Sequence, residues 1–346
     1  MPATDALSDV LRAVHLNGAV YLDGEFSAPW SIASQAESTF CAAYLPPSER
    51  VLSFHFVTEG SCWAMLPHDR KGAVKVEAGD VVVVPLGETH VLGSAVDLPA
   101  AAGDPLVADR VAGNPGEVML LRHGGGGETT RMVCGFLAAQ NVTHNPLLCA
   151  LPRLFKVDMR ESGAPWLESS LRFAAREAAS SRAGGTTVLA KLSELLFVEA
   201  VRRYVDTLPD DRSGWLAGLR DRFVSRALAL MHAHPAHAWT VDDLARRIGS
   251  SRSALAQRFT GLVGVPPIQY LAQWRLQLAA EELRRAERSV AQVAEQVGYE
   301  SEAAFNRAFK REFGMPPATW RRNATGVVTR GEVGARRAAP GGLAPG

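Results

Sequence analysis

This chain of 346 residues has no long apolar segment and no closely paired cysteines, and its net charge is only +1. No run of about 18 apolar residues occurs, so the sequence predicts no membrane-spanning helix. The first residues lack the basic start and apolar run of a signal peptide. The cysteines show no CxxC pair and no zinc-ribbon spacing; they are Cys41, Cys62, Cys134 and Cys149. Together these absences predict a cytoplasmic protein with reduced thiols and no role at a membrane.

Patterns that indicate catalysis are missing as well. No Ser/His/Asp set, phosphate-binding glycine loop or pair of carboxylates at a typical spacing stands out. The sequence therefore predicts neither an enzyme nor a bound cofactor.

The charge that is present is divided unevenly along the chain. Residues 212–323 carry a formal charge of +7, residues 324–346 carry +2, and residues 1–211 carry −8, although the total is only +1. A basic segment beside an acidic one favours nucleic-acid binding by the C-terminal third alone.

One helical motif is written twice in that basic segment, over Thr240–Pro267 and again over Ser289–Pro317. The first halves match at an offset of 49 and the second halves at an offset of 50, so the second copy has one extra residue in its turn. The matched positions in the first copy are Thr240, Val241, Leu244, Ala245, Ile248, Gly249, Leu255, Phe259, Gly264, Pro266 and Pro267. Their counterparts in the second copy, in the same order, are Ser289, Val290, Val293, Ala294, Val297, Gly298, Phe305, Phe309, Gly314, Pro316 and Pro317.

Each copy has the order of residues that a helix–turn–helix requires. A Thr or Ser N-cap opens a helix, a small residue allows close crossing, and a glycine four positions later permits the left-handed turn. A second helix follows with a buried stripe at helical spacing and ends at a glycine. Two such copies in register predict two DNA-binding helix–turn–helix units in one molecule.

The rest of the chain predicts a multidomain α+β protein. Residues 5–145 contain segments with the residue pattern of β-strands, for example Leu52–Glu59, Val74–Gly93 and Val118–Ala139. These segments indicate a small β-barrel or sandwich. Residues 146–210 indicate a helical hairpin formed by Trp166–Ala179 and Thr187–Tyr204. Residues 215–323 are the all-α helix–turn–helix domain, and residues 324–346 are expected to be a disordered tail.

The hairpin has two open interpretations. The helix expected over Thr187–Tyr204 has a broad apolar face, which would either pack on the β domain or form a dimer interface. Both need the same stripe, which consists of Leu189, Leu192, Leu195, Leu196 and Val198.

The β domain offers one set of candidate site residues. Gly79, Pro85, His90 and Ser94 have the spacing of the second motif of cupin barrels, and His55 stands where the first motif begins. Val57 replaces the second histidine of that motif, with Glu59 two residues later, so the ligand set is depleted and we predict no metal site. His55 and His90 are expected to line an effector pocket or to satisfy core hydrogen bonds.

Cys62 and Cys134 lie in or beside predicted strands. A thiol redox switch is conceivable for them, but nothing nearby indicates a lowered thiol pKa, which favours buried, inert cysteines.

The doubled motif, its GxPP endings and the connecting helix over Gln269–Arg284 resemble the DNA-binding domain of the AraC/XylS family. Residues 5–323 as a whole resemble the subgroup with an N-terminal cupin-like sensor domain. The resemblance implies a bacterial transcription regulator with a cupin-like β-barrel, a helical hairpin linker and two helix–turn–helix units. Its expected partners are double-stranded promoter DNA, an unknown small-molecule or redox effector, RNA polymerase and a second copy of itself.

The resemblance also implies that the second helix of each copy enters a major groove. Once the core positions are removed, the residues expected to face DNA in the first copy are Arg252, Ser253, Ala256 and Gln257. In the second copy they are Ser301, Ala303, Ala304, Asn306, Arg307, Lys310 and Arg311. Gln257 suits adenine, Arg307 suits guanine, and Asn306 suits adenine or a phosphate. The residues that suit phosphates are Ser301, Lys310 and Arg311.

Two other functions remain open from the sequence. One is a cupin-type metalloenzyme with an appended DNA-binding module, motivated by the segment Gly79–His90. The other is a thiol-based redox-sensing regulator that uses Cys62 or Cys134.

Overall fold

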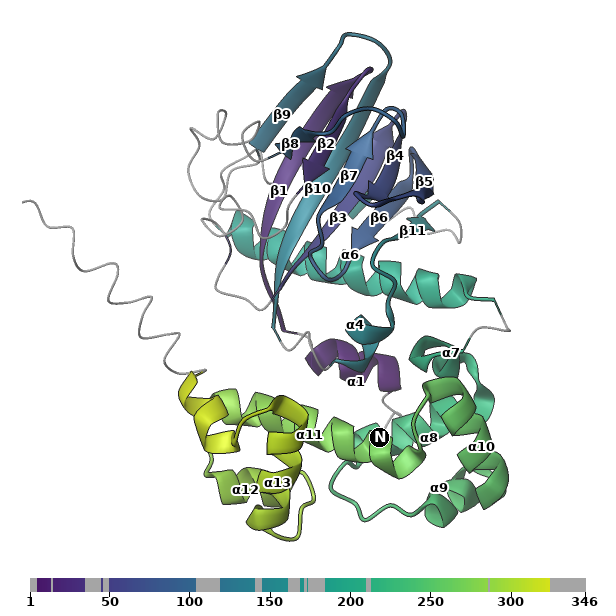
Figure 1. The fold of residues 1–346 in the computed structure, drawn as a ribbon, viewed down its shortest axis with the longest axis vertical. Helices are drawn as coiled ribbons and strands as arrows, with labels where there is room; N and C mark the ends of the chain where they lie inside the picture. The colour runs from purple at the N-terminus through teal and green to yellow at the C-terminus, as the bar shows by residue number, and fades with distance from the viewer. Residues whose placement is uncertain are drawn as a thin grey trace, which may run out of the picture. The chain divides into compact units, whose positions relative to one another are not determined.

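The computed structural model (Figure 1) describes residues 5–13, 15–34, 45, 50–103, 119–140, 145–160, 169–170, 173, 184–209, 213–285 and 287–323. The expected tail and most of the helix expected over residues 166–179 lie outside these ranges. The chain divides into two compact units, Val10–Arg212 and Met1–Asp9 with Ser213–Gly346. We call them the β unit and the helical unit and describe each by itself.

Two sheets form the β unit, as the alternating strands predicted. Sheet A has the strand order β11-β6-β3-β10-β1-β9 and sheet B the order β5-β4-β7-β2-β8. The strands are β1 (His15–Ser27), β2 (Ser31–Ser34), β3 (Arg50–Glu59), β4 (Ser61–Leu66), β5 (Asp69–Glu77), β6 (Asp80–Val84), β7 (His90–Gly93), β8 (Ala101–Ala102), β9 (Met119–Gly124), β10 (Thr129–Gln140) and β11 (Phe155–Asp158).

The core of the β unit consists of apolar side chains from both sheets. Val57, Val82 and Met132 come from sheet A, Ala64 and Leu92 come from sheet B, and all five are buried. Gly79 turns β5 into β6 with a φ of +95°, as expected for the Ala-Gly-Asp turn. This layering places the inward-facing side chains of β3, β7 and β10 in one interior.

Residues 146–210 are not helical throughout, and this part of the prediction was wrong. After α4 (Pro146–Ala150) the chain forms β11, which pairs antiparallel with β6. In β11 the side chains of Phe155 and Val157 are buried and that of Lys156 is exposed, a two-residue period too short to stand out in the sequence. This segment therefore extends sheet A.

The helix α6 (Gly185–Thr207) packs against β1, β10 and β11, so the packing interpretation of its apolar stripe is confirmed for part of the helix. Leu196 is buried as expected, but Leu195 is 44% exposed. The rest of the buried face of α6 consists of residues that the sequence analysis did not single out: Ser193, Phe197, Ala200, Val201 and Val205.

The helical unit contains the predicted repeat. Its helices are α7 (Trp215–Arg220), α8 (Arg222–Ala233), α9 (Val241–Ile248), α10 (Arg252–Val263), α11 (Pro267–Arg285), α12 (Val290–Gln296) and α13 (Glu302–Phe313), and α1 (Ala6–Ala13) begins in this unit. The pair α9–α10 is the first helix–turn–helix, α12–α13 is the second, and α11 connects them (Figure 1).

Candidate nucleic-acid interface

The two helix–turn–helix pairs are built by the same local signals. The Thr240 hydroxyl accepts a hydrogen bond from the Asp243 N–H and caps α9. Ser289 caps α12 within a reciprocal capping box with Gln292. In both turns the glycine has a positive φ, +74° at Gly249 and +87° at Gly298. Each first helix is therefore joined to its second helix, α10 or α13, through a left-handed glycine, although the second turn is longer.

The outward face of α10 carries the residues expected to contact DNA from the first copy. Leu255 and Phe259 are fully buried beneath it. The side chains of Arg252, Ser253 and Gln257 are exposed, and Ala256 is half-buried.

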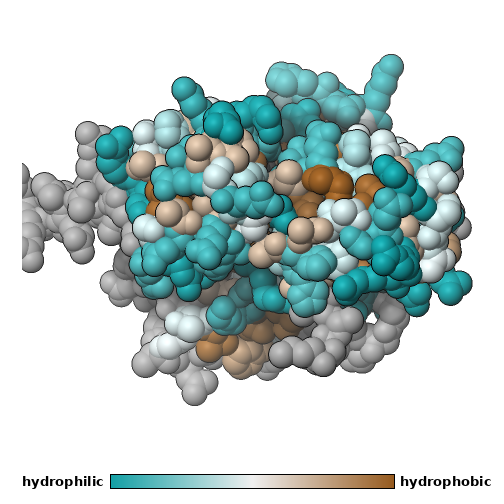
Figure 2. Space-filling view, turned by 90° about the horizontal axis from the view of Figure 1, so that it is seen from below, coloured by the Kyte–Doolittle hydropathy of each residue, from teal (hydrophilic) through white to brown (hydrophobic). Residues whose placement is uncertain are grey.

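The outward face of α13 is organised in the same way around Phe305 and Phe309, which are fully buried. The Ser301 hydroxyl caps α13 by accepting from the Ala304 N–H, and its own O–H remains able to donate to a phosphate. Of the other expected residues, Asn306 and Ala304 are half-buried and the following are exposed: Ala303, Arg307, Lys310 and Arg311. Figure 2 shows this unit from below, with hydrophilic side chains over most of the face and apolar ones in small groups between them.

Cations near α10 are tied to carboxylates of the same unit. Arg252 lies 3.5 Å from Asp242, although both side chains are more than half exposed, so this pair contributes little stability. Arg258 donates from Nε to the Asp221 carboxylate at 2.5 Å. Sequence reasoning missed this pair because 37 positions separate its members, and it marks Arg258 as a structural residue of α10.

Asp221 is the N-cap of α8 and is only 8% exposed. Burial by itself would raise the pKa of this carboxyl, but hydrogen bonds from the Val224 N–H, Arg258 and the Phe223 N–H outweigh burial and lower it. A group with a lowered pKa stabilises the fold above its unfolded pKa of about 3.9, and this contribution is lost as the pH falls through the folded value.

The substitution Asp221→Asn keeps a capping acceptor but removes the charge. We expect it to lower the free energy of unfolding by about 1 kcal/mol at pH 7 and by less at pH 3, which lies below the unfolded pKa of Asp. Urea unfolding followed by tryptophan fluorescence at both pH values measures this. An equal loss at both pH values would mean that the charge is not what stabilises α8.

The β unit brings together the two histidines that the sequence singled out. His55 on β3 and His90 on β7 are 2% and 0% exposed, and their Nε2 atoms lie 2.6 Å apart. Nδ1 of His90 lies 3.0 Å from the Glu88 carbonyl oxygen, which can only accept, so His90 carries its proton on Nδ1. Nε2 of His90 is then the acceptor, and Nε2 of His55 is the donor.

This tautomer leaves Nδ1 of His55 as a buried acceptor without a hydrogen-bond partner. Burial, with the neighbouring His90 as a second cause, holds the pKa of His55 well below its usual value. Burial also lowers the pKa of His90, although its bond to the Glu88 carbonyl acts in the opposite direction. Both rings are therefore neutral near pH 7.

The two histidines do not fit a metal centre of the kind that cupin motifs suggest. Glu59 is an exposed residue that pairs with Arg131 at 3.1 Å, and the Ser94 hydroxyl is bonded to the backbone of Trp30. Within the described ranges no group of three or more His, Cys, Asp or Glu side chains could hold a metal ion. Two nitrogen donors alone are fewer than a stable protein site uses.

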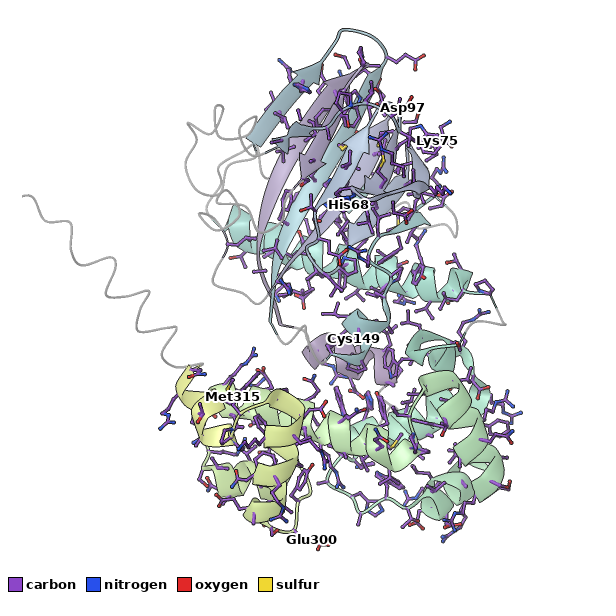
Figure 3. The ribbon with its side chains drawn as sticks, viewed as in Figure 1. His68, Lys75, Asp97, Cys149, Glu300 and Met315 are labelled. Carbon is purple, nitrogen blue, oxygen red and sulfur yellow. The ribbon has the colours of Figure 1, made fainter. Side chains whose placement is uncertain are left out.

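Cys134 lies directly across from His55 in the pairing of β10 with β3, and Cys62 is buried on β4. Burial raises the pKa of Cys62 to about 12 and raises that of Cys134 as well. Both thiols are therefore protonated near pH 7, which disfavours reaction with an oxidant. The exposed cysteine of the described part of the chain is Cys149 (Figure 3).

Comparison with known proteins agrees with both halves of this architecture. Residues 5–206 match a family model described as a cupin, and residues 244–323 match one described as a helix-turn-helix domain. The chain is 30% identical to the HTH-type transcriptional regulator AlkR of Acinetobacter baylyi, over 92% of this chain and 99% of AlkR.

Two AraC-like transcription regulators of Streptomyces are similarly related. The protein from Streptomyces antibioticus is 29% identical over 92% of this chain, and the one from Streptomyces lividans is 30% identical over 93%; in each case 99% of the relative is covered.

The class of protein that this fold defines is a two-part regulator, with a cupin domain before a double helix–turn–helix. The chain belongs to the AraC family of transcription regulators. It is a DNA-binding transcription regulator. No helix in the described part of the chain is long and apolar enough to cross a membrane.

Proposed function

We propose that α10 and α13 enter two successive major grooves on one face of promoter DNA, about 34 Å apart. The observation that carries this proposal is that each helix buries its two aromatic or aliphatic core residues completely and turns its polar residues outward. One molecule would then bind two adjacent, direct and non-identical half-sites.

In this arrangement the two helices read different bases. Gln257 on α10 would pair bidentately with adenine. Arg307 on α13 would pair with guanine, and Asn306 beside it with adenine or a phosphate. Ser301, Lys310 and Arg311 would position the second helix on the backbone without selecting sequence.

Footprinting on the DNA that flanks the gene tests this function. Two protected segments one helical turn apart on one face would support it. An absence of protection at every concentration tested would remove the proposal of a promoter site there.

The β unit is proposed to bind the effector that controls DNA binding. The unpartnered Nδ1 of His55 supports this, because a buried acceptor gains most from a ligand hydroxyl or N–H donor. The depleted donor set favours a ligand held by hydrogen bonds over a metalloenzyme, and the protonated thiols of Cys62 and Cys134 disfavour a redox sensor. A thermal-shift screen of small molecules on wild type and His55→Leu would separate ligands that use this atom from those that do not.

A second copy of the chain is proposed to pack on α6. Val188 and Leu195 are 38% and 44% exposed and lie two turns apart, so they share one face of the helix. We expect Leu195→Glu to convert a dimer to a monomer in sedimentation velocity. Arg202→Glu, which changes an exposed residue of the same helix, is the control and should leave the dimer intact. A monomeric wild type would rule out this interface.

RNA polymerase is the last proposed partner, because a regulator bound beside a promoter can act by contacting it. In-vitro transcription with the footprinted promoter, with and without the protein, would establish whether the regulator activates or represses.

A further inference from the structure

The connecting helix α11 is divided between the two helix–turn–helix pairs. In its first half, the Tyr270 hydroxyl accepts a hydrogen bond from Trp215 Nε1 and contacts His232 Nε2, each at 2.8 Å. Burial lowers the pKa of His232 to about 3, so its ring is neutral. Trp274 stacks on the same ring at 4.2 Å. This half is therefore fixed to α7 and α8.

The second half of α11 belongs to the other helix–turn–helix. Its side chains share one core with Phe305 and Phe309, and they are Leu276, Ala279, Ala280 and Leu283. Trp320 Nε1 also donates to the Ala280 carbonyl at 3.2 Å. A helix of 19 residues is about 28 Å long, and a single rod of that length between two bodies can bend.

A second connection runs beside this rod. The loop 234–239 joins α8 to α9 and so belongs to the first helix–turn–helix. Arg275, at the middle of α11, donates from Nε to the Pro235 carbonyl at 2.6 Å and from Nη2 to the His237 carbonyl at 2.9 Å. One planar guanidinium therefore holds two carbonyl groups of the loop in a fixed orientation.

The far side of the loop meets the second helix–turn–helix at Gly298. A Cβ atom on Gly298 would lie 2.7 Å from the Cα and O atoms of Ala236, a distance that real Cβ atoms do not adopt. At Gly249, the equivalent glycine of the first copy, a Cβ would meet nothing within 4 Å. Gly298 thus has two roles, a positive φ and a close contact, whereas Gly249 has only the first. Gly298 lies between α12 and α13, in the same turn as Glu300, which is labelled in Figure 3.

The loop is itself rigidly held. Trp239 is 5% exposed, and its Nε1 donates to the His234 carbonyl at 3.0 Å. The Arg247 guanidinium of α9 lies 4.8 Å above the Trp239 ring. A displacement of the second helix–turn–helix relative to the first would therefore have to break the loop's internal bonds or its contact with Gly298.

We propose that the loop 234–239, clamped by Arg275 and pressed against Gly298, is a brace that sets the angle and separation of the two DNA-reading helices. Arg275 and Gly298 are positioning residues that touch no DNA. By fixing the second helix relative to the first, they determine the spacing of half-sites that the protein accepts. This proposal rests on the proposed reading of two half-sites by one molecule.

The test uses the full-length protein and a duplex selected by wild type from a random-sequence pool, together with derivatives in which one base pair is inserted or removed between the half-sites. One base pair shifts the second half-site along and around the duplex, so wild type is expected to lose at least about 5- to 150-fold in affinity, the range of one lost base contact. The measured quantity is the ratio of affinities for the selected and altered spacings. It does not depend on the fraction of folded protein.

Arg275→Met and Gly298→Ala are expected to bring this ratio close to one, and Arg275→Lys to give an intermediate ratio. The matched controls are Gly249→Ala, with the same backbone strain but no clash, and Arg285→Met, which removes another guanidinium from α11. Both should keep the wild-type ratio. Unchanged ratios in Arg275→Met and Gly298→Ala, or equal losses in the controls, would overturn the brace. A wild type that ignores spacing would instead contradict the two-site reading itself.

Discussion

Replacing Arg307 by alanine is expected to weaken binding to a selected duplex by about 1–3 kcal/mol, roughly 5- to 150-fold. Arg307 lies on the exposed face of α13, directly above the core formed by Phe305 and Phe309. Its guanidinium can donate two parallel hydrogen bonds to the O6 and N7 atoms of guanine. The loss should therefore be concentrated at one base pair, where the variant accepts other bases almost equally well.

The control for this prediction removes the same charge elsewhere. Arg288 lies before α12 and is paired with Glu282 at 2.6 Å, so Arg288→Ala changes the net charge without touching the outward face of α13. A variant that has lost only electrostatic attraction weakens binding to all sequences alike. If Arg307→Ala lowered affinity uniformly, as expected for Arg288→Ala, Arg307 would be a phosphate contact rather than a base reader.

Acid is expected to destabilise the β unit steeply below about pH 6.5, because His55 and His90 are buried as neutral rings. Their folded pKa values are lowered, so the unfolded chain binds more protons once the pH falls below the unfolded value of about 6.5. The contribution of the two neutral rings to the free energy of unfolding is thus fully present above that pH and decreases as the pH falls below it. Two such groups give a limiting slope of about 2.7 kcal/mol per pH unit.

Removing both rings together should abolish this acid response. In His55→Leu/His90→Leu neither ring is left without the other, and only the half-buried Glu88 residue loses a donor to its carbonyl. We therefore expect a loss of no more than about 1 kcal/mol at pH 8 and greater stability than wild type at pH 5. His90→Leu alone leaves His55 Nε2–H without its acceptor and should cost about 1–3 kcal/mol at pH 8. Urea unfolding across this pH range measures all three proteins. An acid response that survives in the double variant would assign it to other groups.

The features predicted correctly from sequence are those set by neighbouring residues. The N-caps at Thr240 and Ser289, the left-handed Gly249 and Gly298, and the buried stripes of α10 and α13 each depend on residues a few positions apart. Such local signals can be recognised in a single sequence. Because each signal occurs in both copies of the motif, the two copies support the same prediction of a helix–turn–helix.

Features that depend on contacts between distant segments were missed. The pairing of β11 with β6, the Arg258–Asp221 ion pair and the clamp of Arg275 on the loop have no local signature. His55 and His90 were singled out by motif spacing, but their direct contact across the two sheets could not be foreseen. The rotation of α6 about its own axis decides that Leu195 is exposed. This rotation depends on the shape of the sheet against which α6 packs, which the sequence of the helix does not encode.

Selection of bound duplexes from a random pool, followed by footprinting of wild type on the selected DNA, measures whether one molecule reads two different half-sites. We expect a bipartite site with two different half-sites one helical turn apart on one face. We also expect Gln257→Ala to relax one half-site and Arg307→Ala only the other. A single half-site in the selected DNA, or relaxation of the same base pair by both substitutions, would contradict the claim that one molecule reads DNA with two unequal helices.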